Sequence, residues 1–200
     1  MTSFVISHFQ AAALIQARQR GLAQAQSSPD LALTTVSVLL NANGVAFPTV
    51  ELLDWDSLSA VAADENACYQ LFKGELIKIQ TFSEDTGRAF SLYPTQAAPT
   101  MLISGIPMHR IKDTDPHRDT LEKIRAARPV VGRVLDTATG LGYTAIEAAH
   151  TAAHVTTIEL DPAALQMARL NPWSRELFDN PKITQRMGDS FDVVAGLEDG

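Results

Sequence analysis

The sequence predicts an α/β fold in which a small α+β module, residues 1–100, precedes a parallel sheet with intervening helices, residues 101–200. Three observations predict this arrangement. Strand-like and helix-like segments alternate after Pro129, a strand runs directly into a glycine turn at Gly140, and turn-forming residues divide the first hundred positions into short strands. Parallel neighbours need a crossover between them, so the alternation predicts right-handed strand–helix–strand units.

Composition and length fit a globular protein with one large or two small domains. The 200 residues are 46% hydrophobic and 20% charged. No apolar run approaches the roughly 20 residues that cross a bilayer, and the first residues lack the pattern of a secretion signal. We therefore expect a cytoplasmic protein without a membrane partner. Cys68 is the single cysteine, which excludes an internal disulfide and a cysteine-based zinc site, and no metal is expected.

The charge is unevenly distributed along the chain. A net charge of -7 argues against a protein that coats nucleic acid through its overall field. Residues 109–133 nevertheless hold seven of the basic residues among four acidic ones. We interpret this segment as a solvated helix face, with a surface for an anionic substrate as the alternative. The substrate is either a small molecule or an RNA. Whether the protein forms a homo-oligomer is also open.

The first half is expected to alternate short strands and helices. We predict a helix at 9–20, a loop at 24–29, strands at 31–40 and 45–53, a helix at 56–72, and a hairpin of strands at 76–82 and 88–93. Asp54 or Asp56 is the expected cap of the second helix. Pro94 and Pro99 stand among small residues and mark the expected boundary between the two parts.

The second half carries the more informative pattern. We predict a helix at 120–127 that Asp115 and Pro116 open, strands at 130–135, 155–158 and 182–187, and helices at 143–153 and 162–170. Ligands of such sheets bind outside the carboxyl ends of the strands. The residues at those three strand ends are therefore the candidates for a binding site.

The first strand end forms a glycine turn that is suited to a ligand. Gly140 and Gly142 lack a β-carbon, so the backbone can turn sharply and approach a ligand closely, while free amides at the start of the following helix can donate hydrogen bonds. The run from Val134 to Thr144 resembles motif I of the class I, Rossmann-like S-adenosylmethionine-dependent methyltransferases. The resemblance implies that Asp136, Gly140 and Gly142 surround the methionine part of S-adenosylmethionine. Thr137 and Tyr143 of the same run are also expected to bind the cofactor.

Two further strand ends extend the predicted site. Glu159 ends the second strand, where a carboxylate can accept two hydrogen bonds from a ribose diol. The resemblance implies that Glu159 holds the adenosine hydroxyls and that Leu160 lines the adenine pocket. It also implies that Asp189 lies near the adenine amino group, with Ser190 or Phe191 flanking the ring. Asp161 precedes Pro162, and we interpret it as a helix cap.

Longer stretches of residues 101–200 are similar to a group of predicted methyltransferases known chiefly from archaea. They are the run from Ser104 to Pro116, the glycine turn with its flanks from Asp136 to Glu147, and the run from Asn171 to Leu177. The similarity implies methyl transfer with S-adenosylmethionine as the cofactor. The substrate of that group is unassigned, so the methyl acceptor stays unknown.

Three other functions compete with methyl transfer. The turn from Gly140 to Ala145 also matches a dinucleotide fingerprint, so an NAD-dependent oxidoreductase is the first alternative. The carboxylate of Asp136 disfavours it, because a pyrophosphate avoids nearby negative charge. An aminopropyltransferase similar to spermidine synthase is the second, although its longer glycine-rich turn is absent. A cofactor-binding or assembly module without turnover is the third.

The sequence leaves the catalytic residues unknown. We expect the sheet to be incomplete at the carboxyl terminus, because the acceptor-side motif that follows the fourth strand in the resembled family is missing. Asn171-Pro172-Trp173 is interpreted as a helix stop and not as that motif. His109 and His117 lie in the basic segment and either face a substrate or have structural roles, and His150 and His154 are expected to be structural.

Overall fold

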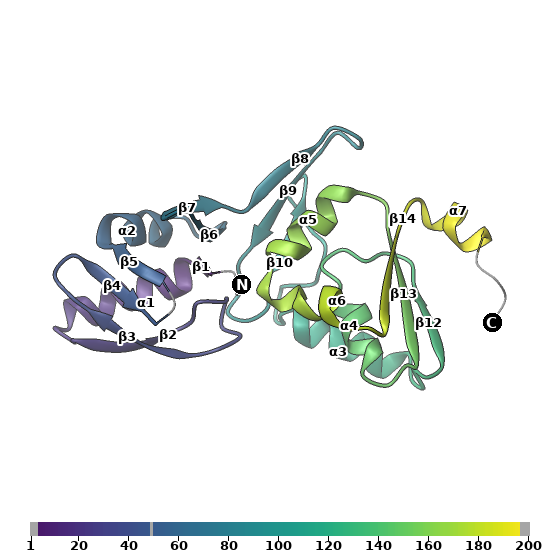
Figure 1. The fold of residues 1–200 in the computed structure, drawn as a ribbon, viewed down its shortest axis with the longest axis horizontal. Helices are drawn as coiled ribbons and strands as arrows, with labels where there is room; N and C mark the ends of the chain where they lie inside the picture. The colour runs from purple at the N-terminus through teal and green to yellow at the C-terminus, as the bar shows by residue number, and fades with distance from the viewer. Residues whose placement is uncertain (1–3, 49, 197–200) are drawn as a thin grey trace.

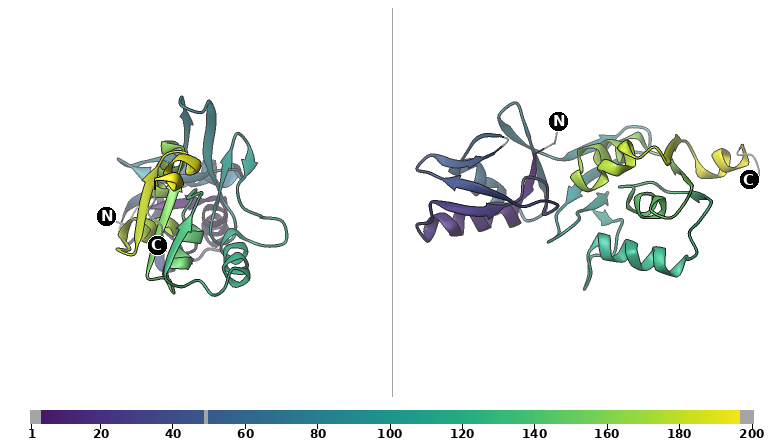
Figure 2. Two further views of the ribbon diagram at one scale, coloured as in Figure 1. Left: turned by 90° about the vertical axis from the view of Figure 1, so that its right-hand side faces the viewer. Right: turned by 60° about the horizontal axis from the view of Figure 1, so that its bottom comes forward.

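The computed structural model describes residues 4–48 and 50–196. Within these residues the chain forms four small sheets and seven α-helices (Figure 1). An amino-terminal part and a part built on a parallel sheet lie toward opposite ends of an elongated molecule, and an antiparallel sheet lies between them (Figure 2). No helix within the described ranges is long and apolar enough to cross a membrane.

Two antiparallel sheets and two helices build the amino-terminal part. One sheet has the order β1-β6-β7 and the other the order β2-β3-β4-β5. Their core contains Leu14 of α1 and Leu58 of α2, both fully buried. The element bounds are β1 Val5–Ser7, α1 His8–Gln19, β2 Gln24–Ser27, β3 Val36–Leu40, β4 Gly44–Phe47, β5 Val50–Asp54, α2 Trp55–Ala63, β6 Cys68–Phe72 and β7 Glu75–Lys78.

The structure corrects three element predictions in this part. The expected single strand at 45–53 is a hairpin of β4 and β5, which pair antiparallel. The expected loop at 24–29 contains strand β2, which is polar in sequence but pairs along its whole length with β3. The expected helix at 56–72 ends at Ala63 because the carboxylate of Asp64 accepts a hydrogen bond from the amide of Asn66 at 3.0 Å and forms a turn. Strand β6 then follows. The predicted cap of Asp54 is confirmed, since its carboxylate accepts from the amide of Ser57 at 2.8 Å.

A third antiparallel sheet joins the two parts. It has the order β11-β10-β9-β8, with β8 at Gln80–Ser83, β9 at Arg88–Tyr93, β10 at Thr100–Ile103 and β11 at Ile106–Pro107. The predicted hairpin is confirmed for β8 and β9, whereas residues 76–78 of its predicted first strand belong to β7 and pair with β6. Phe90, Leu92 and Met101 of this sheet share one hydrophobic core with Ala164 and Met167 of helix α5. The division of the chain at residue 100 stays a prediction.

The parallel sheet confirms the predicted α/β class. Its strands have the order β12-β13-β14, and helix α4 contacts all three. Helix α3 packs against α4. The bounds are α3 Pro116–Ala126, β12 Arg133–Asp136, α4 Tyr143–Ala149, β13 His154–Glu159, α5 Pro162–Leu170, a 3₁₀ turn Pro172–Ser174, α6 Arg175–Asp179, β14 Ile183–Met187 and α7 Ser190–Ala195.

We predict that Met167 of α5 stabilises the core that this helix shares with the linking sheet. Met167→Ala removes a fully buried side chain and leaves a cavity, so the free energy of unfolding should fall by about 2–5 kcal/mol. Urea unfolding measures this change, with the exposed neighbour substitution Gln166→Ala as the control. Equal unfolding free energies for the two variants would contradict the shared core.

Candidate functional site

The carboxyl ends of the three parallel strands meet at one edge of the sheet, where a small cavity lies. The cavity has a volume of about 120 Å³ and is lined by Thr137, Ala138, Ile158, Glu159, Leu160, Gly188, Asp189 and Ser190. Five of the nine predicted cofactor-binding residues are in this lining. The chain therefore gathers residues from three separate strand ends around one space.

The carboxylate of Glu159 points at the glycine turn. Its Oε2 accepts a hydrogen bond from the amide of Gly140 at 2.8 Å, and its Oε1 accepts one from the amide of Asp161 at 3.1 Å. Both donors are backbone groups, which hold the carboxylate in one orientation beside the cavity. The two oxygens retain lone pairs for a further donor.

Asp136 is a carboxylate without a cationic partner among the described residues. It accepts a hydrogen bond from the hydroxyl of Thr157 at 2.9 Å, and Thr157 in turn lies 2.7 Å from the hydroxyl of Thr139. Burial raises the pKa of Asp136, hydrogen bonds partly oppose this, and the negative charge of Glu159 raises the pKa further. A bound cation or donor would therefore stabilise the charged form of Asp136.

The backbone of the turn favours glycine at both positions, and packing adds a constraint at Gly142. Gly140 and Gly142 have φ angles of 51° and 78°, which favour glycine. A β-carbon at Gly142 would lie 2.7 Å from the side chain of Leu177, and one at Gly140 would lie 2.1 Å from Cε of Met108. The space beside Gly140, which we expected to admit a ligand, is occupied by the side chain of Met108.

The side chain of Tyr143 lies in the core and not in the cavity lining. Its hydroxyl donates to the carbonyl of Pro99 at 2.9 Å and accepts from the side-chain amide of Asn171 at 2.8 Å. Burial raises its pKa well above the usual value. Only the backbone of Tyr143 is left to contact a ligand.

A buried polar network, which the sequence analysis missed, holds the glycine turn. The side-chain amide of Asn171 also donates to the hydroxyl of Ser174 at 2.7 Å, and Ser174 donates to the carbonyl of Leu141 at 2.7 Å. Asn171 does follow the end of α5, as predicted, so it ends one element and fixes another. No local pattern in the sequence reveals this role, because the partners Tyr143 and Leu141 lie 28 and 33 residues away from Asn171 and Ser174.

The third strand end contributes the rim of the cavity. Asp189 is exposed, and its carboxylate accepts from the amide of Phe191 at 2.8 Å, so it caps helix α7. Phe191 is 83% exposed. Asp189 therefore has a structural role in addition to the binding role that the sequence analysis predicts.

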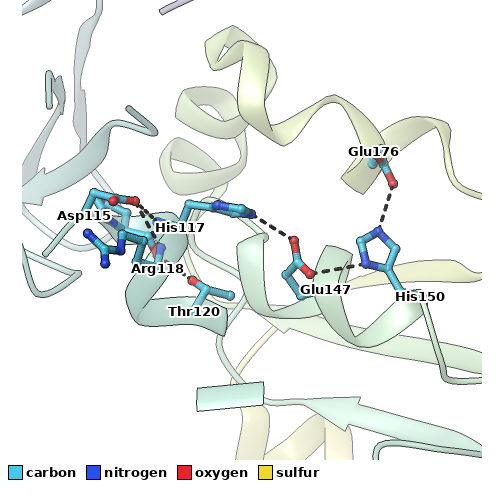
Figure 3. Close-up of polar contacts among 8 residues, drawn as sticks. Asp115, His117, Arg118, Thr120, Glu147, His150 and Glu176 are labelled. Atoms are coloured by element: carbon cyan, nitrogen blue, oxygen red, sulfur yellow. Dashed lines mark hydrogen bonds and ion pairs between the residues drawn. The ribbon is translucent and has the colours of Figure 1, made fainter. Parts of the chain in front are cut away.

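The histidines of the basic segment have partners within the protein. His117 lies 3.2 Å from Glu147, and His150 contacts the other oxygen of Glu147 at 3.2 Å and Glu176 at 3.9 Å (Figure 3). This cluster connects α3, α4 and α6. His109 lies 3.0 Å from the hydroxyl of Thr100, and burial, with a contribution from Lys123, lowers its pKa to about 4.

The remaining side chains of the basic segment lie at the surface. Lys123 pairs with Asp119 at 2.6 Å. Six others are exposed and form no ion pair among the described residues: Arg110, Lys112, Arg118, Arg125, Arg128 and Arg133. Both interpretations of the segment, a solvated face and an anion-binding surface, stay open. The part of the chain that the structure describes contains no group of three or more metal-ligating side chains placed to hold a metal ion.

Comparison of the sequence with known proteins finds one uncharacterised relative. No family model matches the chain. The protein MJ1233 of Methanocaldococcus jannaschii is 42% identical over 148 residues, which are 74% of this chain and 50% of the relative. The chain therefore spans about half the length of the curated relative that it matches.

Solved structures with a related arrangement are more distant. A spermidine synthase from Thermotoga maritima matches with a TM-score of 0.48 and 16% identity, over 64% of this chain and 47% of that one. Trm5b from Pyrococcus abyssi matches with a TM-score of 0.32 and 16% identity, over 62% of this chain and 33% of that one. Both TM-scores are below 0.5, so the fold class rests on the strand order of this chain.

We predict that His109 makes the stability of the protein depend on pH. Its pKa is lower in the folded chain, about 4, than the usual 6.5, so the unfolded chain binds a proton first as the pH falls. The contribution is complete above pH 6.5 and is lost as the pH drops toward 4. Urea unfolding at several pH values should therefore show a shallower loss of stability in His109→Gln than in the wild type. Identical pH slopes would contradict the prediction.

Proposed function

We propose that this chain binds S-adenosylmethionine at the carboxyl ends of β12 and β13 and forms the cofactor-binding part of a methyltransferase. One observation carries the proposal: the carboxylate of Glu159 lines the cavity and is held by the amide of Gly140 at 2.8 Å. A carboxylate fixed in this way at the end of a second parallel strand is suited to the hydroxyls of a ribose.

The neighbouring residues fit the rest of a nucleoside. Leu160 is 54% exposed and offers an apolar surface to an adenine ring, and Asp189 and Ser190 line the same space. We propose these three residues for the adenine end of the cofactor. Asp136 would hold the methionine end, because its carboxylate lacks a cationic partner among the described residues and burial raises its pKa.

The charge around the cavity favours S-adenosylmethionine over a dinucleotide. Asp136, Glu159 and Asp189 bring three carboxyl groups to the same edge of the sheet. The sulfonium and amino groups of S-adenosylmethionine are positive, whereas the pyrophosphate of NAD is negative. Electrostatic repulsion therefore disfavours the oxidoreductase alternative.

The dimensions of the cavity define what this part of the chain contributes. Small-molecule sites usually enclose about 300–1,000 Å³, and the cavity has about 120 Å³. We propose that the residues around it form one wall of the cofactor site. The methionine end would reach Gly140 only after Met108 changes rotamer, which its flexible side chain permits.

The cofactor would supply an activated methyl group on its sulfonium, ready for direct displacement. The residues of this chain would bind and orient that group, and positioning contributes much of the rate in such reactions. We propose no catalytic residue. The acceptor, a small molecule or an RNA, is left to experiment.

Titration calorimetry with S-adenosylmethionine tests the proposal. Glu159→Ala removes the acceptor for two ribose hydroxyls, so we expect the affinity to fall about 10- to 100-fold. Glu65→Ala, which removes an exposed glutamate of the amino-terminal part, should leave the affinity unchanged.

Parallel titrations separate the alternative functions. Binding of NAD without binding of S-adenosylmethionine would overturn the proposal in favour of an oxidoreductase. A clear preference for decarboxylated S-adenosylmethionine would point to aminopropyl transfer. Binding without labelled-methyl transfer to a metabolite or RNA extract would indicate a module without turnover.

A further inference from the structure

The tip of the β8–β9 hairpin reaches the edge of the parallel sheet where the cavity lies. The hairpin projects beyond helix α5 (Figure 1). Between its strands, the hydroxyl of Thr86 donates to Oδ2 of Asp161 at 2.5 Å. Asp161 lies two residues after Glu159, so the hairpin contacts the segment that carries the proposed ribose-binding carboxylate.

Asp161 connects three elements through separate atoms. Its Oδ1 accepts from the amide of Ala163 at 2.9 Å and caps helix α5, its Oδ2 accepts from Thr86, and its own amide donates to Oε1 of Glu159 at 3.1 Å. The residue is 5% exposed. Loss of the hydrogen bond to either carboxylate oxygen of Asp161 would therefore change the orientation of the Asp161 amide, which holds Glu159.

The environment of Asp161 keeps its carboxyl group deprotonated. Burial raises the pKa of Asp161, but the hydrogen bonds from Thr86 and the Ala163 amide lower it, and so do the hydroxyl of Ser83 and the positive charge of Arg88. The net result is a pKa below the usual value. The bond from Thr86 is therefore made to a carboxylate at neutral pH, and bonds to charged groups are the stronger ones.

Apolar packing holds the hairpin in reach of Asp161. Phe90 and Leu92 of β9 are buried in one core with Ala164 and Met167 of α5. The strands are thus fixed along the helix, and Thr86 makes the polar contact at its amino-terminal end. This arrangement favours a rigid hairpin over one that moves freely.

We infer that Thr86 is a positioning residue for Glu159, acting through Asp161, and that the β8–β9 hairpin is part of the adenosine-binding site. The inference rests on the proposed function and extends it, because it assigns to residues before position 100 a role in nucleoside binding. Its consequence is specific: loss of the Thr86 hydroxyl should weaken contacts to the ribose diol and leave contacts to the adenine ring intact.

The experiment compares two ligands and two variants. Thr86→Val removes the hydroxyl and keeps the shape of the side chain. Titration calorimetry with adenosine should show an affinity about three- to tenfold lower than that of the wild type, as expected for one hydrogen bond. With 2′,3′-dideoxyadenosine, which lacks the diol, the wild type and Thr86→Val should bind equally.

A matched control removes a comparable hydroxyl elsewhere. Thr151→Val deletes the bond that Thr151 donates to the carbonyl of Val130 at 2.6 Å, after the carboxyl end of α4. This variant should leave adenosine binding unchanged. Thermal unfolding of both variants shows whether they lose similar stability. If they do, an affinity that falls only in Thr86→Val reflects the binding site and not a general loss of stability.

The outcomes separate this inference from the proposed function. If the wild type binds adenosine and S-adenosylmethionine but Thr86→Val binds both nucleosides as the wild type does, the inference fails and the proposed function stands. An equal loss for adenosine and the dideoxy analogue would also overturn the inference. If the wild type binds S-adenosylmethionine but not adenosine, the inference fails and the proposed function stands. If the wild type binds neither compound, both fail.

Discussion

The hydrogen bond between the carboxylate of Glu159 and the amide of Gly140 is the interaction on which the site depends. It joins the ends of β12 and β13, which are neighbouring parallel strands, and it fixes a charge beside the cavity. The bond requires a turn with a positive φ at Gly140, which glycine provides without strain. This one hydrogen bond therefore depends on the strand order, on the conformation of the glycine turn and on the negative charge of Glu159.

Buried polar side chains stabilise the glycine turn. Asn171, Ser174 and Tyr143 form a buried network that reaches the carbonyl of Leu141 and the loop before β10. Buried polar groups are costly unless they are paired, so a network with these partners specifies one arrangement of the turn. The loops that flank the strands of the linking sheet take part through Pro99 and Thr86, which bond to Tyr143 and Asp161 beside the site.

Local sequence patterns predicted the parallel sheet and the strand ends, because alternation of elements and a glycine turn are local properties. Prediction failed where pairing or packing with distant residues determines the local structure. Strand β2 is polar and forms through β3, and Met108 fills the space beside Gly140 from a separate loop. The roles of Asn171 and Thr86 likewise depend on partners 28 and 75 residues away, which no local pattern reveals.

Nuclear magnetic resonance of the ¹⁵N-labelled chain tests the central claim most directly, because the amide of Gly140 reports on Glu159. On titration with S-adenosylmethionine, the account predicts that the largest amide shifts occur at Gly140, Leu160 and Gly188, around the cavity. Shifts confined to another surface, such as the cavity over β8 and β9 near Phe82, would contradict it, as would a spectrum that the cofactor leaves unchanged.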